Sequence, residues 1–280
     1  MTIDALHNSS ASDLRPTPPT PPASSGRRAR ILAITSGKGG VGKTFLAANL
    51  AAALARRGER VLVLDADLGL ANLDVVLNLH PKVTLHDVFT GKVSLEDAIL
   101  PAPCGFSVLL AGSGLVEYSR LTPEVREKLV QIIETVTPRF DHILIDTGAG
   151  ISDVVLYAVS LADAVLVIST PEPTSMTDAY AMIKVLATQQ KRRAIRLVIN
   201  QVGRVGDGRA IRNQLQLVVD KFVAPQLAPE SGSLKLDLIG EVPDDSAVRA
   251  AVVKRKLLLA IQPGCAAAQA IEAIATKLVL

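Results

Sequence analysis

The sequence predicts a three-layer α/β protein, in which a mostly parallel sheet carries helices on both faces. Apolar runs rich in β-branched residues recur along the chain, as expected of strands that are buried on both sides. The first run leads into a glycine-rich loop and then into an alanine-rich helical segment. Two further runs end in aspartate, and in an open parallel sheet such strand ends face a common ligand crevice. The fold is therefore predicted to bind a ligand at the carboxyl ends of its strands.

Length and composition fit a globular chain with its own core. The 280 residues suit one large domain or two small ones, and 49% of them are apolar. The net charge of +3 selects no partner, and the absence of tryptophan argues against a stacking platform for single-stranded nucleic acid. Cys104 and Cys265 stand alone, which gives no support to a zinc or iron–sulfur site and fits a reducing cytosol. No signal peptide or membrane span is predicted.

The chain is predicted to divide into a tail, residues 1–28, and one folded domain, residues 29–280. Prolines crowd residues 16–22, and small polar residues follow them. This composition favours an extended, polyproline-like linker over a helix or a central strand. We therefore expect a disordered tail ahead of the first strand.

The first strand is predicted at Ile31–Thr35, and the helix after the loop at Phe45–Ala55, with a stop at Gly58. Between them lies the sequence Ser-Gly-Lys-Gly-Gly-Val-Gly-Lys-Thr, residues 36–44. Its glycines allow successive backbone N–H groups to turn inward, and the helix N-terminus adds partial positive charge. In such a loop Lys43 supplies a full charge for the β- and γ-phosphates of a nucleotide, and Thr44 supplies a hydroxyl for Mg²⁺.

Acidic residues follow two of the predicted strands. Asp65 and Asp67 come after the strand Arg60–Leu64, and Asp146 ends the strand His142–Asp146. Carboxylates brought together beside a phosphate loop are costly unless a cation lies between them, which supports a Mg²⁺ site or a role in orienting water. A solvated acidic loop is the alternative for the first pair. Asp146 fits the strand-ending carboxylate that holds a Mg²⁺-bound water, and the glycines after it predict a mobile loop.

The other elements complete the α/β pattern. Besides the elements above, the sequence predicts short helices at 84–89 and 95–100, a strand at 107–111, a helix beginning at Thr122-Pro123, strands at 165–169 and 196–200, a helix start at 170–184, a strand and turn at 238–245, and helices at 257–261 and 266–280. The strand at 196–200 is taken as the last parallel strand.

The loop resembles the deviant Walker A box of the MinD/ParA ATPases, because it carries a second lysine, Lys38, near its start. Asp65 to Asp74, Asp146 to Gly150 and Thr170 to Lys184 resemble the FlhG/FleN branch of that family, and the likeness spans about Arg30 to Ala260. The resemblance implies a slow, Mg²⁺-dependent ATPase that binds ATP or ADP and dimerises with ATP.

Each site role in that family falls on a residue of this chain. Lys38 would reach the partner subunit's nucleotide, Asp67 would orient the attacking water, and Asp65 would lie near the Mg²⁺ shell. Asn200 would read the adenine edge, and the segment around Pro243 would wall the base. The catalytic set is then Lys38, Lys43 and Asp67; the metal set is Thr44, Asp65 and Asp146. The nucleotide-binding set adds Gly37, Lys38, Gly39, Gly40, Val41, Gly42, Lys43, Thr44, Asn200 and Pro243.

The resemblance also implies partners: the FlhF GTPase, and a flagellar transcription activator or C-ring proteins. Residues 9–15 share an alanine, a leucine and an arginine with a short helix that stimulates FlhF in some members. The expected location is the cytoplasm, including the inner membrane face or the cell pole. A ParA-type DNA-partition ATPase, a MinD-type division-site ATPase and a small-molecule P-loop enzyme of the dethiobiotin-synthetase type are the alternatives.

Two surface features bear on these alternatives. Basic clusters at 191–196 and 254–256 resemble DNA-binding charge, but solvated helix ends explain such runs more often. The stripe of Ile271, Ile274, Leu278 and Leu280 is apolar, yet Lys277 is the one cation of the last turns. Such a helix makes a poor anchor for anionic lipid, and packing against the sheet is expected instead. DNA binding is therefore not expected, and membrane association stays open.

Overall fold

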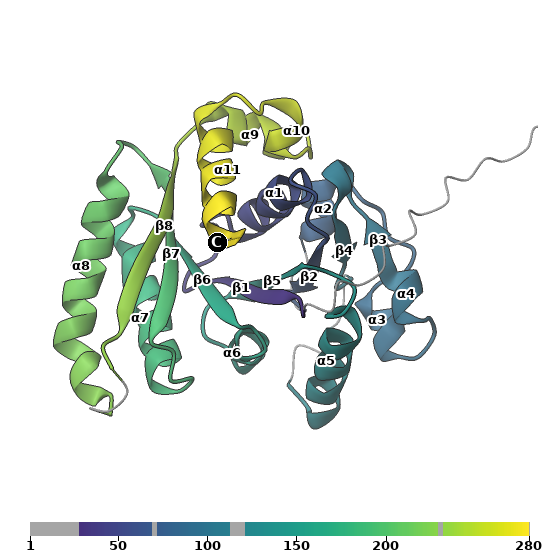
Figure 1. The fold of residues 1–280 in the computed structure, drawn as a ribbon, viewed down its shortest axis with the longest axis horizontal. Coiled ribbons are helices and arrows are strands. Elements are labelled where there is room, and N and C mark those ends of the chain that lie inside the picture. The colour runs from purple at the N-terminus through teal and green to yellow at the C-terminus, as the bar shows by residue number, and fades with distance from the viewer. Residues whose placement is uncertain (1–27, 69–71, 113–120, 229–231, 280) are drawn as a thin grey trace, which may run out of the picture.

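The computed structural model describes residues 28–68, 72–112, 121–228 and 232–279. In these ranges an eight-stranded sheet runs in the order β3-β4-β2-β5-β1-β6-β7-β8 (Figure 1). Neighbouring strands are parallel except β3 and β4, so the predicted, mostly parallel sheet is confirmed. The strands are β1 Arg30–Ser36, β2 Val61–Ala66, β3 Ile99–Pro101, β4 Ser107–Leu109, β5 His142–Ala149, β6 Ala164–Ser169, β7 Ala194–Val202 and β8 Lys235–Pro243. The predicted tail lies almost wholly outside the described residues.

Helices cover both faces of the sheet. In Figure 1, α1, α9, α10 and α11 lie above the sheet, and α5, α6 and α7 lie below it. The helices are α1 Lys43–Ala55, α2 Leu73–Leu77, α3 Leu85–Phe89, α4 Leu95–Ala98, α5 Pro123–Val136, α6 Asp153–Ser160, α7 Pro173–Thr188, α8 Asp207–Phe222, α9 Ser246–Val253, α10 Leu258–Ile261 and α11 Ala266–Val279. None of them combines the length and the apolar character that a bilayer crossing needs.

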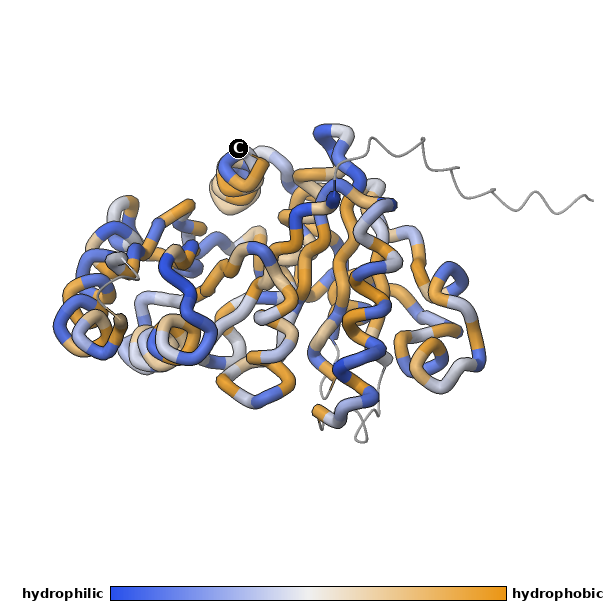
Figure 2. The backbone as a smooth tube through the Cα atoms, turned by 60° about the horizontal axis from the view of Figure 1, so that its bottom comes forward, coloured by the Kyte–Doolittle hydropathy of each residue, from blue (hydrophilic) through white to orange (hydrophobic). Residues whose placement is uncertain are grey.

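The central strands contribute side chains to two separate hydrophobic cores, one on each face of the sheet. In β1, Ile31 and Ala33 pack into the core beneath α5, α6 and α7, whereas Leu32 and Ile34 pack into the core around α1 and α11. Successive side chains of a strand point to opposite faces, so a run that is apolar at every position is the pattern of a strand covered on both sides. Figure 2 shows these strands as a largely orange, hydrophobic centre.

The C-terminal helix packs on the sheet, as the sequence predicts. Ile271, Ile274 and Leu278 of α11 are buried against the core that also holds α1. The Lys277 ammonium donates to the carbonyl of Ile239 in β8, at 2.8 Å. The apolar stripe of α11 is therefore part of the core, apart from Leu280, which lies outside the described residues.

The structure corrects two element assignments near the edges of the sheet. The helix predicted at 95–100 ends at Ala98, because Ile99 and Leu100 pair antiparallel with β4. The strand at 196–200 is not the last parallel one, since β8 pairs parallel with β7 from Lys235 onward. Helices α2, α6, α8 and α9 have no counterpart in the sequence prediction.

The basic run at 191–196 is also reinterpreted. The Arg192 guanidinium donates to the carbonyls of Val159, Ala162 and Asp163 at 3.2, 2.6 and 3.1 Å. The Arg193 guanidinium donates to the carbonyl of Ala187 at 2.9 Å. These two arginines donate hydrogen bonds to carbonyl groups near the C-terminal ends of helices. A cation is also stabilised there by the partial negative charge of the helix end. Both arginines are structural rather than solvated side chains.

Candidate functional site

The glycine-rich loop lies between β1, in the middle of the sheet, and α1. Gly40 and Gly42 have left-handed φ angles of 78° and 93°, which favour glycine. Gly42 immediately precedes α1, which has no side-chain cap and no acidic residue in its first turn. The first N–H groups of α1 are therefore left without a side-chain partner, which makes this helix start a favourable place for an anion.

Two neighbouring residues lie so close to the loop that there is no room for a side chain at Gly37 or at Gly42. A Cβ on Gly37 would lie 2.0 Å from the carbonyl oxygen of Asp178 in α7, and one on Gly42 would lie 2.5 Å from Nδ2 of Asn200. The Asn200 amide donates to the carbonyl of Val41 at 2.8 Å. Asn200 therefore holds the loop from the end of β7, and its contact with an adenine stays a prediction.

A pair of buried carboxylates lies beside the loop. Asp65 of β2 and Asp146 of β5 are direct partners in the parallel register, and each is 1% exposed. Oδ1 of Asp65 accepts from the N–H of Asp67 at 3.1 Å, and the Thr44 side chain hydrogen-bonds to Asp146. Oδ2 of Asp65 and Oδ1 of Asp146 have no hydrogen-bond partner among the described residues. Buried oxygens left in this way are expected to meet a further ligand.

The electrostatics of these groups favour the binding of a cation. Burial raises the pKa of Asp146 to about 7, although the Thr44 hydrogen bond and the charge of Lys43 oppose the rise. Burial and the neighbouring Asp146 raise the pKa of Asp65 well above its usual range. Burial lowers the pKa of Lys43, and the negative charges of Asp146 and Asp67 partly offset this decrease. The Lys43 ammonium thus interacts with the carboxylates of Asp146 and Asp67, while Asp65 interacts with Asp146 and Asp67.

The residues present fit Mg²⁺. Oδ2 of Asp65 and Oδ1 of Asp146 are buried without a hydrogen-bond partner among the described residues, and carboxylate oxygens are ligands that Mg²⁺ prefers. Mg²⁺ commonly draws its other ligands from phosphate oxygens and water. Thr44, Asp65 and Asp146 would hold it, and it would neutralise charge on the phosphates.

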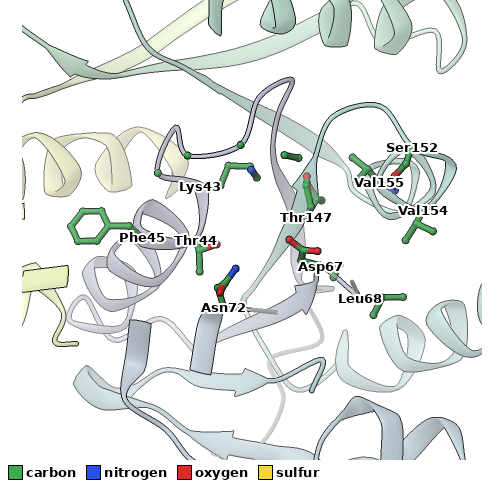
Figure 3. Close-up of a pocket in the computed structure, with 16 residues that line it drawn as sticks. Lys43, Thr44, Phe45, Asp67, Leu68, Asn72, Thr147, Ser152, Val154 and Val155 are labelled. Atoms are coloured by element: carbon green, nitrogen blue, oxygen red, sulfur yellow. Dashed lines mark hydrogen bonds between the residues drawn. The ribbon is translucent and has the colours of Figure 1, made fainter. Parts of the chain in front are cut away.

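A cavity of about 580 Å³ opens above this group. Figure 3 shows Lys43 and Thr44 on one side of it, Asp67 and Thr147 across from them, and Ser152 with Val154 and Val155, at the start of α6, on the far wall. Oδ1 of Asp67 lies 3.3 Å from the position that a Cβ on Gly148 would take, so Gly148 leaves room for this carboxylate. The remaining lining residues are Gly39, Gly40, Gly42, Phe45, Ala66, Leu68, Asn72, Gly148 and Ala149.

Seven predicted site residues do not line the cavity: Gly37, Lys38, Val41, Asp65, Asp146, Asn200 and Pro243. The Lys38 ammonium instead meets Oε2 of Glu172 at 2.6 Å and the hydroxyl of Thr174 at 2.8 Å, at the start of α7. Pro243 ends β8 and is partly buried. The cation of Lys38 is thus held beside the loop, outside the cavity of its own chain.

The sequence analysis did not predict that residues of α6 line the cavity, and it wrongly predicted the conformation of the segment before α6. Residues 147–149, predicted as a mobile loop, continue β5, because Ala149 pairs with Ser36 and the N–H of Gly150 donates to the carbonyl of Ser36 at 2.9 Å. The Thr147 hydroxyl also donates to the carbonyl of Ile34 at 3.1 Å. Ser152-Asp153 is a helix-start signal that could have revealed α6, since Ser152 caps it.

A strand, a glycine loop whose lysine and threonine open a helix, and an acid-ended neighbouring strand define a P-loop nucleotide-binding protein. The AAA domain family matches residues 29–199. The chain is 40% identical to the antiactivator FleN of Pseudomonas aeruginosa over 89% of this chain and 85% of that protein. It is 34% identical to the flagellum site-determining protein YlxH of Helicobacter pylori over 89% of this chain and 82% of that protein. Septum site-determining MinD of Pyrococcus horikoshii, solved with Mg-ADP, superposes with a TM-score of 0.69 at 28% identity, covering 89% of this chain and 96% of that one.

The chain belongs to the MinD/ParA family of ATPases, in its FlhG branch. It is accordingly an ATPase of FlhG type whose cofactors are ATP or ADP and Mg²⁺. Members of this family dimerise with ATP.

Proposed function

We propose that this chain is a switch that controls flagellar number and placement, with an ATP-bound homodimer as its active state. The observation that carries the proposal is the position of Lys38. Its ammonium lies outside the cavity of its own chain, against Glu172 and Thr174, and 36% of its side chain is exposed. A cation held at the surface next to the nucleotide loop is available to a second copy, which supports a role on the partner's phosphates.

In this proposal the cavity holds ATP, and residues 29–280 act as one ATPase domain. Lys43 and the loop N–H groups bind the phosphates, while Lys38 stabilises charge on the partner's phosphates in the manner of an arginine finger. Asp67 orients the water for in-line attack, and Asn200 and Pro243 flank the adenine. Hydrolysis then opens the dimer, so the output is a change of surface rather than a metabolic product.

The partners are inferred from the relatives. The names of FleN and YlxH describe an antiactivator and a flagellum site-determining protein. We extend this to a flagellar transcription activator, C-ring proteins and an FlhF-type GTPase as partners, with residues 9–15 as a candidate segment for the GTPase. The chain would work in the cytoplasm, at the inner membrane face or the cell pole where flagella assemble.

The test is size-exclusion chromatography of Asp67→Ala with ATP and with ADP. Loss of the water-orienting carboxylate should leave ATP bound and trap the dimer, while ADP should give monomer. Lys38→Ala is the matched control, because it should bind ATP and yet stay monomeric. Hydrolysis by Asp67→Ala at the wild-type rate would contradict the role of Asp67, and a Lys38→Ala dimer would contradict the role of Lys38.

The same trapped dimer tests the partners. Added FlhF or the flagellar transcription activator should co-elute with it and not with the ADP form. ATP-dependent, salt-sensitive binding of duplex DNA in place of these proteins would favour the ParA-type alternative. Arg192 and Arg193 argue against that outcome, since their guanidinium groups already bind backbone carbonyls.

A further inference from the structure

The turn between α9 and α10 exposes five consecutive residues that the nucleotide switch does not use. Val252 and Val253 are 51% and 78% exposed, and Lys254, Arg255 and Lys256 follow them, all exposed. Arg255 has a left-handed φ of 51°, which turns the chain back toward buried Leu257 and α10. We call residues 252–256 the α9–α10 turn.

Helix geometry explains why these valines face outward. Ala247 and Ala251 are the buried residues of α9 and fix its inner face. Arg249 is exposed and lies three and four positions before Val252 and Val253, so the three share the outer face. No ion pair engages Arg249, Lys254, Arg255 or Lys256 within the described part of the chain. Four uncompensated cations therefore surround two exposed apolar side chains.

This combination occurs once among the described residues. The other large apolar side chains that are strongly exposed are Val75, Ile151, Val205, Leu217 and Phe222, and no two of them are adjacent in sequence. The apolar stripe of α11 is buried in the core. The α9–α10 turn is thus where adjacent exposed apolar groups and a run of cations coincide.

We propose that the α9–α10 turn docks on an anionic lipid bilayer. The valines would enter the boundary between headgroups and acyl chains, and the cations would meet the lipid phosphates. Duplex DNA would attract the same cations, but it offers no apolar boundary for Val252 and Val253. A protein partner would need a larger surface than one five-residue corner supplies. The bilayer is the occupant that uses both the charge and the apolar groups.

None of residues 252–256 lines the nucleotide cavity, so this surface is tested on the full chain without nucleotide. Sedimentation with vesicles of phosphatidylglycerol and phosphatidylcholine should recover the protein, whereas vesicles of phosphatidylcholine alone should not. Lys254→Gln with Lys256→Gln should weaken binding about 30-fold, because each cation at such a surface contributes about a fivefold factor. The control Lys92→Gln with Lys235→Gln removes two exposed cations elsewhere and should bind like wild type.

A second pair of variants tests the apolar contribution. Val252→Ser with Val253→Ser should lower vesicle affinity about tenfold or more, and the remaining binding should still fall with salt. Leu217→Ser, at a side chain 70% exposed on α8, should leave binding unchanged. Absence of wild-type binding, equal losses in the controls, or a charge variant that loses DNA but keeps vesicles would each overturn the proposal. ATP-dependent dimerisation should be the same in all variants, which separates this result from failure of the switch.

Discussion

At the scale of single residues, Lys43 is the charge on which the site depends. It is buried beside Asp146 and Asp67, and burial lowers its pKa. Lys43→Ala should weaken ATP binding by about a hundredfold or more, because it removes a charge-assisted phosphate contact and leaves the carboxylates uncompensated. Titration with a fluorescent ATP analogue measures this. The exposed Lys92→Ala is the control, and unchanged affinity in the Lys43 variant would rule out its phosphate contact.

The buried carboxylates should make the nucleotide-free protein less stable as pH rises. Burial raises the pKa of Asp146 to about 7 from an ordinary value of 3.8. Between these values the folded chain holds a proton that the unfolded chain has lost, so the free energy of unfolding falls as pH rises through this window. Asp146→Asn removes the titrating carboxyl and should flatten the decline.

Thermal melts at about pH 5 and about pH 8, without nucleotide or Mg²⁺, measure this effect. The Tm of Asp146→Asn relative to wild type should be higher at the upper pH than at the lower one. Equal differences at both pH values would show that Asp146 does not titrate between them.

At the scale of elements, the contact between the loop and α7 should be sensitive to a single methyl group. A Cβ on Gly37 would lie 2.0 Å from the backbone oxygen of Asp178, whereas one on Gly39 has its nearest neighbour at 3.9 Å. Gly37→Ala should therefore displace the loop and destabilise the fold by about 1–3 kcal/mol. Gly39→Ala is the matched control for stability only, because Gly39 itself lines the cavity. Chemical denaturation of both variants tests this, and similar free energies of unfolding for the two would refute the contact.

The contact of α11 with β8 offers a compensating pair. A Cβ on Gly240 would lie 2.2 Å from Cγ1 of Ile274, a side chain that is 1% exposed. Gly240→Ala should destabilise by about 1–3 kcal/mol, and Ile274→Ala by about 2–5 kcal/mol through the cavity it leaves. The double variant should lose less than the sum, because the new methyl enters that cavity. Additive losses in urea denaturation would show that the two sites do not share a contact.

These elements also show which features of the fold local sequence patterns can predict. The loop after β1 and the aspartates of β2 and β5 were predictable, because each is marked by local sequence: glycines and a lysine pair in the loop, and aspartates after apolar runs. β3 was not, since its three residues end in Pro101, which removes a donor and is tolerated only at a sheet edge. The contacts of Asn200 with Val41 and of Lys38 with Glu172 join residues 159 and 134 positions apart. No local pattern encodes such contacts, so only the fold reveals them.

At the scale of the whole molecule, the parallel topology brings the predicted site residues to one end of the sheet and connects them to α7. The register places Asp65 beside Asp146, and β1 next to β5 carries the loop to the same edge. The loop in turn contacts α7 through Gly37 and through Lys38. A change in the nucleotide loop, at the carboxyl ends of the strands, can therefore be transmitted through these contacts to the surface at the start of α7.

If Lys38 acts on the partner's phosphates as proposed, the Lys38–Glu172 ion pair is expected to oppose dimer formation. The pair spans 2.6 Å, but its side chains are 36% and 61% exposed, so it is worth at most about 1 kcal/mol. Lys38 must leave Glu172 before it can reach a second copy's phosphates. Glu172→Gln removes the competing charge and should lower the Kd of the ATP-bound dimer by up to about fivefold.

Sedimentation equilibrium in the Asp67→Ala background, with ATP, measures that Kd without interference from hydrolysis. Glu96→Gln is a well-matched control, because Glu96 is 60% exposed and pairs with Arg139 at 3.3 Å, away from the loop. Both variants remove one exposed carboxylate from one ion pair, so a general effect of net charge on association would appear in both. Tighter association confined to Glu172→Gln would identify the pair as a competitor of the dimer. Weaker association in that variant would mean instead that Glu172 belongs to the assembled interface, and this expectation would have to be abandoned.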